Sequence, residues 1–351
     1  MKSLIKNFTI DELKDLVHST GFEKYRAEQI YHSIYKQRID NFNLISNTPI
    51  EVRKYLSSNY ILDSLRLKKV SLSRDGTKKY LFELVDGNKI ETVLIPDTRK
   101  KLRLSLCVSS QVGCTLNCTF CATGKLPFKR NLWVAEIIDQ VLMVEKIEKI
   151  KITNIVFMGM GEPLYNYDNV IKAIKILSNE KYLIVPQKKI TISTVGVKDK
   201  IEELANSGLK VKLAISLHAT TDSIRHKLIP YSKRMTISEL MNSIEYYYRK
   251  TKRQITYEYI FLEGINNSIK DITRLAKICK RVPSKVNIIP YHDISFTNDK
   301  VVEQFKPANK ESIDKFYHKL KQTNTNVFVR TSSGFDIDAA CGQLAYSERF
   351  S

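Results

Sequence analysis

Three cysteines constrain this sequence more than any other feature. Cys114, Cys118 and Cys121 follow one another with a C-x3-C-x2-C spacing, directly after Gly113. A loop of this length can turn three thiolates toward one point. A closed zinc site needs four ligands, but no further Cys or His occurs within twenty residues after Cys121. Three thiolates would leave one iron of a 4Fe-4S cluster open, because such clusters are otherwise held by four cysteines. The spacing favours that cluster over two alternatives, a zinc loop with a distant fourth ligand and three unrelated buried thiols.

The charge balance indicates a polyanionic partner. Lys and Arg together number 57, Asp and Glu number 37, and the formal net charge at pH 7 is +20. Such an excess attracts nucleic acid or an anionic membrane surface. An AT-rich genome that favours Lys codons would raise the same count, so the charge alone does not choose between these explanations.

Nothing in the sequence predicts a membrane anchor or secretion. No apolar run approaches the ~20 residues that a membrane-spanning helix needs, and the first residues lack the apolar core of a signal peptide. We therefore expect a cytoplasmic protein without a membrane partner. Because structural disulfides are rare in that compartment, the six cysteines are expected to bind metal, to act in catalysis or to lie buried.

The first part of the chain, residues 1–62, has a helical pattern. Thr9 and Glu12 fit a capping box, apolar residues follow at helical spacing, and Pro49 suits a first helical turn. This part is basic and aromatic, which favours a helical N-terminal RNA-binding domain. A solvated helical cap is the alternative.

Residues 63–98 are predicted to form a β-hairpin linker region. Three strand-like runs, at 67–73, 78–84 and 89–95, are separated by the dipeptides Asp75-Gly76 and Asp86-Gly87. Asp-Gly between alternating runs is a strong hairpin signal.

Residues 99–351 alternate strand-like and helix-like stretches. The strand candidates lie at 104–109, 152–158, 189–193, 211–217, 255–262, 285–289 and 326–329. Alternation of this kind indicates an α/β domain with a parallel sheet, and six or seven units fit an incomplete (β/α) barrel. The site of such a barrel lies in the loops after its strands, and the cysteine loop follows the first strand, as that layout requires.

Polar residues follow the next three predicted strands. Gly161 and Glu162 follow the second, Ser193 the third, and Ser216 and His218 the fourth. Each alone is more typical of a satisfied loop residue. Because the carboxyl ends of parallel strands share one edge of the sheet, together they favour a ligand site.

The cysteine loop, with Phe120 before its last cysteine, resembles the signature of the radical S-adenosylmethionine (radical SAM) enzymes. Further segments resemble the RlmN/Cfr family within them, and the similarity runs nearly from end to end. These segments are Met158-Gly-Met-Gly-Glu-Pro-Leu164, Thr191-Ile-Ser-Thr194, Ser216-Leu-His218 and Asp336-Ile-Asp-Ala-Ala-Cys-Gly-Gln-Leu344. Pro163 stands where Cfr has Ala, which favours the RlmN branch.

The resemblance implies a radical SAM barrel that binds a 4Fe-4S cluster and S-adenosyl-L-methionine, two molecules of the latter per turnover. It implies methylation of C2 of an adenosine in 23S rRNA, at the peptidyl transferase centre, and of the adenosine beside the anticodon in some tRNAs. Three alternatives stay open. They are Cfr-like methylation of C8 of the same rRNA adenosine, a radical SAM reaction on a non-RNA substrate, and a non-enzymatic zinc module on nucleic acid.

The family motifs also imply roles for single residues. The cluster ligands are Cys114, Cys118 and Cys121. The expected S-adenosylmethionine contacts are Gly161, Glu162, Ser193, Ser216, Leu217, His218 and His292. The family commonly has Asn where this chain has His292, and an imidazole can form hydrogen bonds as well.

Three catalytic residues follow from the same resemblance. Adenine C2 is not nucleophilic, so it cannot attack a methyl sulfonium directly, and radical addition avoids that problem. In the family a cysteine that matches Cys341 carries the methyl group, and one that matches Cys107 releases the adduct by forming a disulfide. Glu91 matches the residue proposed to remove the C2 proton. By sequence alone Glu91 is a strand carboxylate of the kind that usually lies on the surface.

The expected partners follow. A base edge in RNA is usually presented by flipping, and basic loops such as 233–234 and 249–253 would bind phosphate. The resemblance adds an electron donor such as flavodoxin or ferredoxin, and a monomer is expected.

Overall fold

The computed structural model describes residues 2–97, 103–297, 305–330 and 332–345. Within them ten strands form one sheet in the order β14-β13-β12-β11-β10-β9-β6-β5-β4-β3. Seven neighbouring strands of this sheet are mutually parallel. They are β6 (Leu104–Cys107), β9 (Asn154–Phe157), β10 (Ile190–Thr194), β11 (Lys212–Ser216), β12 (Ile255–Phe261), β13 (Ser284–Pro290) and β14 (Val327–Val329). All seven predicted strands and the incomplete barrel are confirmed.

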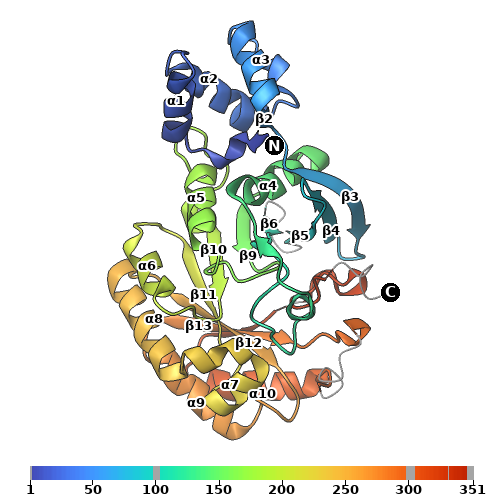
Figure 1. Ribbon diagram of the computed structural model, residues 1–351. Coiled ribbons are helices and arrows are strands. Elements are labelled where there is room, and N and C mark those ends of the chain that lie inside the picture. The colour runs from blue at the N-terminus through green and yellow to red at the C-terminus, as the bar shows by residue number, and fades with distance from the viewer. Residues whose placement is uncertain (1, 98–102, 298–304, 331, 346–351) are drawn as a thin grey trace.

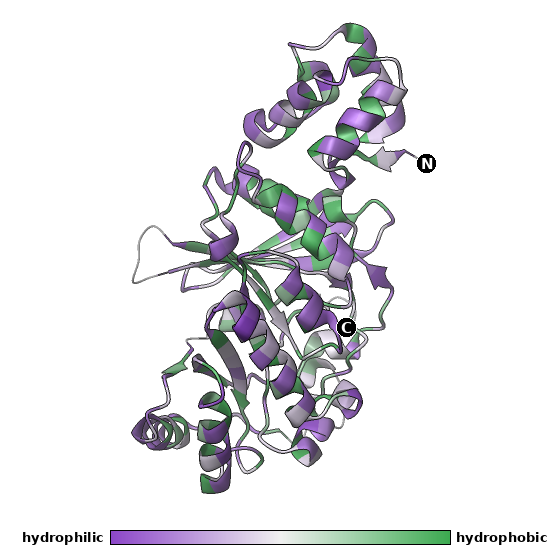
Figure 2. Ribbon diagram, turned by 90° about the vertical axis from the view of Figure 1, so that its left-hand side faces the viewer, coloured by the Kyte–Doolittle hydropathy of each residue, from purple (hydrophilic) through white to green (hydrophobic). Residues whose placement is uncertain are grey.

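Helices connect the parallel strands and cover the outer face of the sheet (Figure 1). They are α4 (Val134–Glu148), α5 (Tyr167–Leu177), α6 (Lys200–Asn206), α7 (Asp222–Leu228), α8 (Ile237–Thr251), α9 (Ile269–Cys279) and α10 (Lys310–Gln322). The short, polar α7 was not predicted. In Figure 2 the central strands are mostly green, and the outer helices carry purple residues.

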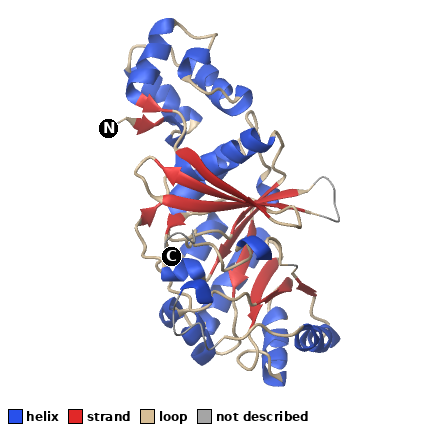
Figure 3. Ribbon diagram, turned by 90° about the vertical axis from the view of Figure 1, so that its right-hand side faces the viewer, coloured by secondary structure: helices blue, strands red, loops and turns tan. Residues whose placement is uncertain are grey.

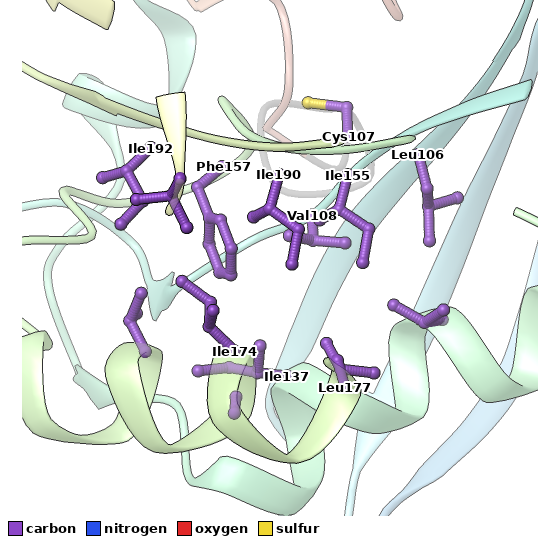
Figure 4. Packing of buried hydrophobic residues seen from close by; sticks show 14 of the residues in the cluster. Leu106, Cys107, Val108, Ile137, Ile155, Phe157, Ile174, Leu177, Ile190 and Ile192 are labelled. Carbon is purple, nitrogen blue, oxygen red and sulfur yellow. The ribbon is translucent and has the colours of Figure 1, made fainter. Parts of the chain in front are cut away.

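The main core lies between the sheet and helices α4 and α5. Figure 4 shows Ile155 and Phe157 of β9 packed toward Ile137 of α4 and Ile174 of α5. Cys107 of β6 points to the opposite side of the strand, away from these side chains. Because side chains alternate across a strand, burying the outer face in this way directs every second residue into the barrel.

The predicted hairpins form β3 (Leu65–Leu72), β4 (Lys78–Leu84) and β5 (Lys89–Pro96), with Gly76 and Gly87 at positive φ in the turns. The sequence pattern does not predict their attachment. β5 pairs antiparallel with β6, with Val93 opposite Cys107, so these strands extend the barrel sheet rather than standing apart from it. The border predicted at residues 98 and 99 lies outside the described residues.

The N-terminal helices are α1 (Ile10–Ser19), α2 (Arg26–His32) and α3 (Ile50–Asn59), and they lie at one end of the molecule (Figure 3). The capping box before α1 is confirmed. The Thr9 N–H donates to Glu12 Oε2 at 2.7 Å, and the Glu12 N–H donates to Thr9 Oγ1 at 3.3 Å. Pro49 immediately precedes α3.

Ion pairs from residues next to these helices hold the N-terminal segment against α4. Lys6 Nζ lies 2.5 Å from Asp139 Oδ1, and Arg38 Nη2 lies 2.7 Å from Glu145 Oε2. Ser64 donates to Asp139 through both its N–H and its hydroxyl. Among the described residues, no helix has the length and apolar character to cross a membrane.

Candidate active site

The cysteine loop follows β6 and the short strand β7 (Gln111–Val112). Gly113 has a φ of 74°, and a Cβ added there would lie 2.2 Å from the carbonyl oxygen of Pro127, so only glycine fits the first turn. Cys114 and Cys118 are buried and Cys121 is half-buried. All three line a cavity of about 140 Å³ together with residues that follow β9, β10 and β11.

The three thiols suit an iron–sulfur cluster. In the described ranges no three His, Cys, Asp or Glu side chains are placed to hold a single metal ion, but the three thiols line one cavity together. In a 4Fe-4S cluster each thiolate binds its own iron, so the sulfurs surround a larger volume. Burial raises the pKa of Cys114 to about 12 and also raises the pKa values of Cys118 and Cys121. The thiolates would therefore depend on a bound cation.

Gly161 and Glu162 lie on the same cavity. Gly161 has a φ of 95°, and a Cβ there would lie 2.5 Å from Cβ of Gln111. Glu162 is buried, and its carboxylate accepts hydrogen bonds from the N–H groups of Leu164 and Val195 at 2.9 and 3.0 Å. Burial raises its pKa to about 7. The carboxylate therefore ties the loop after β9 to the loop after β10.

Ser193, Ser216 and His218 complete this side of the cavity. The two hydroxyl oxygens lie 3.5 Å apart. Nδ1 of His218 accepts from the Ile260 N–H at 3.0 Å, which leaves the proton on Nε2. Burial, and secondly Arg225, lower the pKa of His218 to about 3. These three residues thus present two hydroxyl groups and a neutral imidazole N–H donor to the cavity.

Two of the predicted cosubstrate contacts, Leu217 and His292, do not line this cavity. Leu217 is fully buried beside this cavity, and its N–H donates to the backbone oxygen of Glu258 at 3.1 Å. His292 lines a second cavity of about 570 Å³. Burial lowers the pKa of His292.

Cys341 lies at the junction of the two cavities and lines both. Burial, and secondly the charge of the nearby Cys341, raise the pKa of Cys107 at the end of β6 to about 12. The fold therefore brings together two thiols that are remote in the sequence.

The C-terminal loop places Cys341. Asp336 accepts from the Ser73 hydroxyl at 2.5 Å and from the Arg74 N–H at 3.1 Å, which ties the loop to the β3–β4 turn. On the other side of Cys341, the Gly342 oxygen accepts from the Ala122 N–H at 2.6 Å. One end of the loop is thus fixed on the hairpin and the other on the cysteine loop.

Glu91 of β5 is buried, with 3% of its surface exposed, and not the surface carboxylate that sequence alone favours. Its Oε1 lies 3.2 Å from Nζ of Lys79, which also donates to the Asp338 carbonyl at 3.1 Å. Glu91 and Val93 share a strand face, and Val93 is paired with Cys107. Lys79 thereby links Glu91 to the loop of Cys341.

Comparison with known proteins decides the family. Residues 108–276 match the model of the Radical SAM superfamily, and residues 5–62 match that of the Ribosomal RNA large subunit methyltransferase N-terminal domain. The Dual-specificity RNA methyltransferase RlmN of Geotalea uraniireducens is 42% identical over 97% of this chain and 96% of its own length. The chain belongs to the RlmN family. A crystal structure of a radical SAM methyltransferase from Sphaerobacter thermophilus, 36% identical, covers 97% of this RlmN-family chain and 99% of its own, with a TM-score of 0.91.

Membership in the RlmN family makes the chain a radical SAM methyltransferase of an RNA-modifying family, so the zinc-module hypothesis is wrong. Sequence reasoning missed several residues of the site. Arg225 is 1% exposed and donates to the carbonyls of Val195 and Leu217. Glu258 and Arg330 line the cavity beside Cys341. Glu258 lies within a predicted strand and Arg330 directly follows one, so the strand-end criterion applied to Glu162 would have found Arg330.

Proposed function

We propose that this chain methylates C2 of an adenosine in 23S rRNA, and the adenosine beside the anticodon in some tRNAs, through a methylated cysteine. The observation that supports this most is the meeting of Cys107 and Cys341 beside the cavity of the three-cysteine loop. A radical SAM reaction on a small molecule would not require these two further thiols beside the three of the cysteine loop.

The cavity residues suit the two cofactors. Cys114, Cys118 and Cys121 would hold the cluster, and Gly161, Glu162, Ser193, Ser216 and His218 would contact S-adenosylmethionine. When bound, these groups supply a methyl group and the radical chemistry that an unreactive ring carbon needs. Replacing any of the three cysteines with Ala should abolish bound iron, and full iron loading of the triple variant would contradict the assignment.

Cys341 suits the role of methyl carrier because it lines both cavities. The cavity of about 140 Å³ would present the cosubstrate to its sulfur. The cavity of about 570 Å³ lies within the size range of small-molecule sites and would admit a flipped base. The sulfur between them would accept the methyl group from one side and present it to the base on the other.

Glu91 suits the role of base for the C2 proton. It is buried on the strand face of Cys107, and Lys79 holds its carboxylate near the loop of Cys341. The Lys79 ammonium, 3.2 Å from the carboxylate, places an opposite charge beside it.

The remaining partners complete the proposal. The formal charge of +20 suits RNA. The Geotalea relative is named a dual-specificity RNA methyltransferase, which accords with two RNA substrates. His292 would contact the base rather than the cosubstrate, because it lines the larger cavity. An electron donor such as flavodoxin or ferredoxin would act on a cytoplasmic monomer.

Methyl transfer in vitro tests the function. The reconstituted enzyme is incubated with S-adenosylmethionine, a reductant and either a 23S rRNA fragment or tRNA, and the modified nucleosides are identified after digestion. We expect 2-methyladenosine from both RNAs. Exclusive formation of 8-methyladenosine, or methylation of neither RNA, would contradict the proposal.

Two cysteine variants test the mechanism. Cys341→Ala has no sulfur to alkylate, so it should form neither methylated RNA nor a protein–RNA adduct. Cys107→Ala can accept the methyl group and add to the base, but it should stall as a covalent protein–RNA species because nothing breaks the carbon–sulfur bond. A denaturing gel with radiolabelled RNA distinguishes them. Cys279→Ala, on the barrel helix α9, is the matched control and should behave as the wild type.

A further inference from the structure

Arg330 reaches across the open side of the barrel. It directly follows β14, and its N–H donates to the Ile288 carbonyl at 2.9 Å, which fixes its backbone on β13. Its Nη1 lies 3.6 Å from Sδ of Met158, at the end of β9. Because β9 is the strand next to β6, the guanidinium comes to the end of the strand that carries Cys107. The same side chain lines both cavities with Cys341.

Cys107 is a poor nucleophile by its burial alone. Only 7% of its surface is exposed, and burial and the neighbouring Cys341 raise its pKa to about 12. Arg330 acts in the opposite direction on this thiol. The other charged pair on this strand face is Lys79 with Glu91, in which Lys79 is held by the Glu91 carboxylate and the Asp338 carbonyl. Glu258 is a further charged group beside the thiols, and it faces Arg330.

Glu258 orients Arg330 without fully neutralising it. Its Oε1 accepts from Nδ2 of Asn287 at 2.9 Å, and its Oε2 lies 3.6 Å from Nη1 of Arg330, too far for a close hydrogen bond. Within the described residues Oε2 accepts no hydrogen bond. The carboxylate thus helps to hold the guanidinium in place and leaves part of its charge uncompensated.

We propose that Arg330 is a positioning residue that favours the thiolate form of Cys107 in the step that releases the methylated RNA. The inference rests on the proposed function, since it concerns the adduct on Cys341. Once the Cys341 sulfur is alkylated it can no longer form a thiolate, and Cys107 is then the free thiol of the pair.

In the release step one bond forms and one bond breaks. The Cys107 thiolate attacks the Cys341 sulfur, a sulfur–sulfur bond forms, and the bond from the Cys341 sulfur to the methylene carbon breaks. The electron pair leaves with that carbon, which takes a proton from water and becomes the methyl group of the RNA. The two thiols are oxidised to a disulfide and the methylene is reduced. Only the thiolate attacks in such an exchange, so its fraction sets the rate.

Release of the adduct tests the proposal. The covalent protein–RNA species is formed in one turnover with radiolabelled RNA, and its decay is followed on denaturing gels between pH 6.5 and 9.5. An opposite charge within about 4–6 Å shifts a pKa by 1–3 units. Arg330→Gln should therefore release RNA at least about tenfold more slowly at pH 7.5, and both rates should rise with pH across the range, because the pKa of Cys107 lies above it. Arg330→Lys, which keeps the charge, should recover part of the rate.

Arg281→Gln is the matched control, because Arg281 lines neither of the two cavities and pairs with Glu245 at 2.6 Å. It should release a preformed adduct at the wild-type rate. A release rate for Arg330→Gln equal to that of the wild type, or a rate for Arg330→Lys as low as that of Arg330→Gln, would overturn the proposal, the latter indicating a structural role.

A second measurement does not depend on RNA chemistry. In the reconstituted Cys341→Ala protein, alkylation of Cys107 by iodoacetamide is followed by mass spectrometry as a function of pH. Adding Arg330→Gln should move the profile to higher pH by at least about one unit, since one unit is a tenfold change in thiolate. Unchanged profiles would sink the role of Arg330 even if the enzyme proved inactive on RNA. A shifted profile in an enzyme that forms no adduct would instead count against the proposed function.

Discussion

At the scale of single residues, His218 shows how the fold sets a chemical state. Its backbone lies in the left-handed region with a φ of 58°, and Nδ1 accepts the N–H of Ile260. The amide of Asn266 donates to its carbonyl at 2.8 Å. These contacts hold a neutral ring whose Nε2–H serves as a donor, a state that burial and Arg225 preserve by lowering its pKa to about 3.

That lowered pKa predicts a pH dependence of stability. Between the pKa of an unfolded histidine, 6.5, and about 3, the unfolded chain binds a proton at this position and the folded chain does not. Stability therefore falls as the pH drops below 6.5, by on the order of 2 kcal/mol at pH 5. His218→Gln, which does not titrate and can accept from Ile260, should lose less free energy of unfolding between pH 7 and pH 5.

Denaturant titrations of both proteins at the two pH values check this. Glu162 contributes in the opposite direction, because burial raises its pKa to about 7, but it is present in both proteins and cancels in the comparison. Equal losses of stability would show that His218 does not titrate as described.

At the scale of elements, the C-terminal loop depends on the β3–β4 hairpin. Asp336 accepts from Ser73 and Arg74, and the Gly334 N–H donates to Oδ2 of Asp75 at 3.0 Å. A hairpin predicted as a linker is therefore the support of the loop that carries Cys341. The position of this cysteine is set by contacts with residues early in the chain.

Asp336→Ala should consequently impair Cys341 without disturbing the cluster. The loss of two charge-assisted hydrogen bonds should loosen the loop. We expect at least about a tenfold slower methylation of Cys341, measured by mass spectrometry, with unchanged iron content. Glu180→Ala, which removes an exposed carboxylate, serves as the control. Normal methylation in Asp336→Ala would mean that the contact between Gly342 and Ala122 of the cysteine loop is enough to place Cys341.

At the scale of the whole molecule, the N-terminal helices divide their basic residues between two uses. Lys6 and Arg38 form ion pairs with α4. Lys181 of the barrel pairs with Glu28 of α2. Tyr31 packs against Tyr182 at a centroid distance of 5.0 Å. Lys24, Tyr25 and Lys36 stay exposed, so the surface left for RNA is smaller than the composition of residues 1–62 predicts.

RNA binding should depend on those exposed cations. The double variant Lys24→Ala/Lys36→Ala should bind RNA more weakly, with a salt slope lower by about 1.4–1.8, since each phosphate contact contributes about 0.7–0.9. Filter binding across salt concentrations measures both quantities. Lys315→Ala/Lys319→Ala on α10 removes the same charge from another face and should leave the slope unchanged. Equal slopes for the two variants would place RNA elsewhere.

What the sequence determined by itself was local. The hydrophobic alternation predicts the strands and most helices, because burying one side of a sheet requires that pattern. The Asp-Gly dipeptides predict the turns of the hairpins, and the cysteine spacing predicts an open-sided thiolate group. These features depend on residues a few positions apart, which a sequence displays directly.

Tertiary structure alone decided the rest. The pairing of β5 with β6, the burial of Glu91, the junction of Cys107 with Cys341 and the reach of Arg330 all join segments that are distant in the chain. Local pattern cannot predict them, because the strand curvature and the loop contacts that bring such residues together belong to no single segment. A strand carboxylate is usually exposed, and only the sheet and the loop that cover Glu91 make it a buried group beside two thiols.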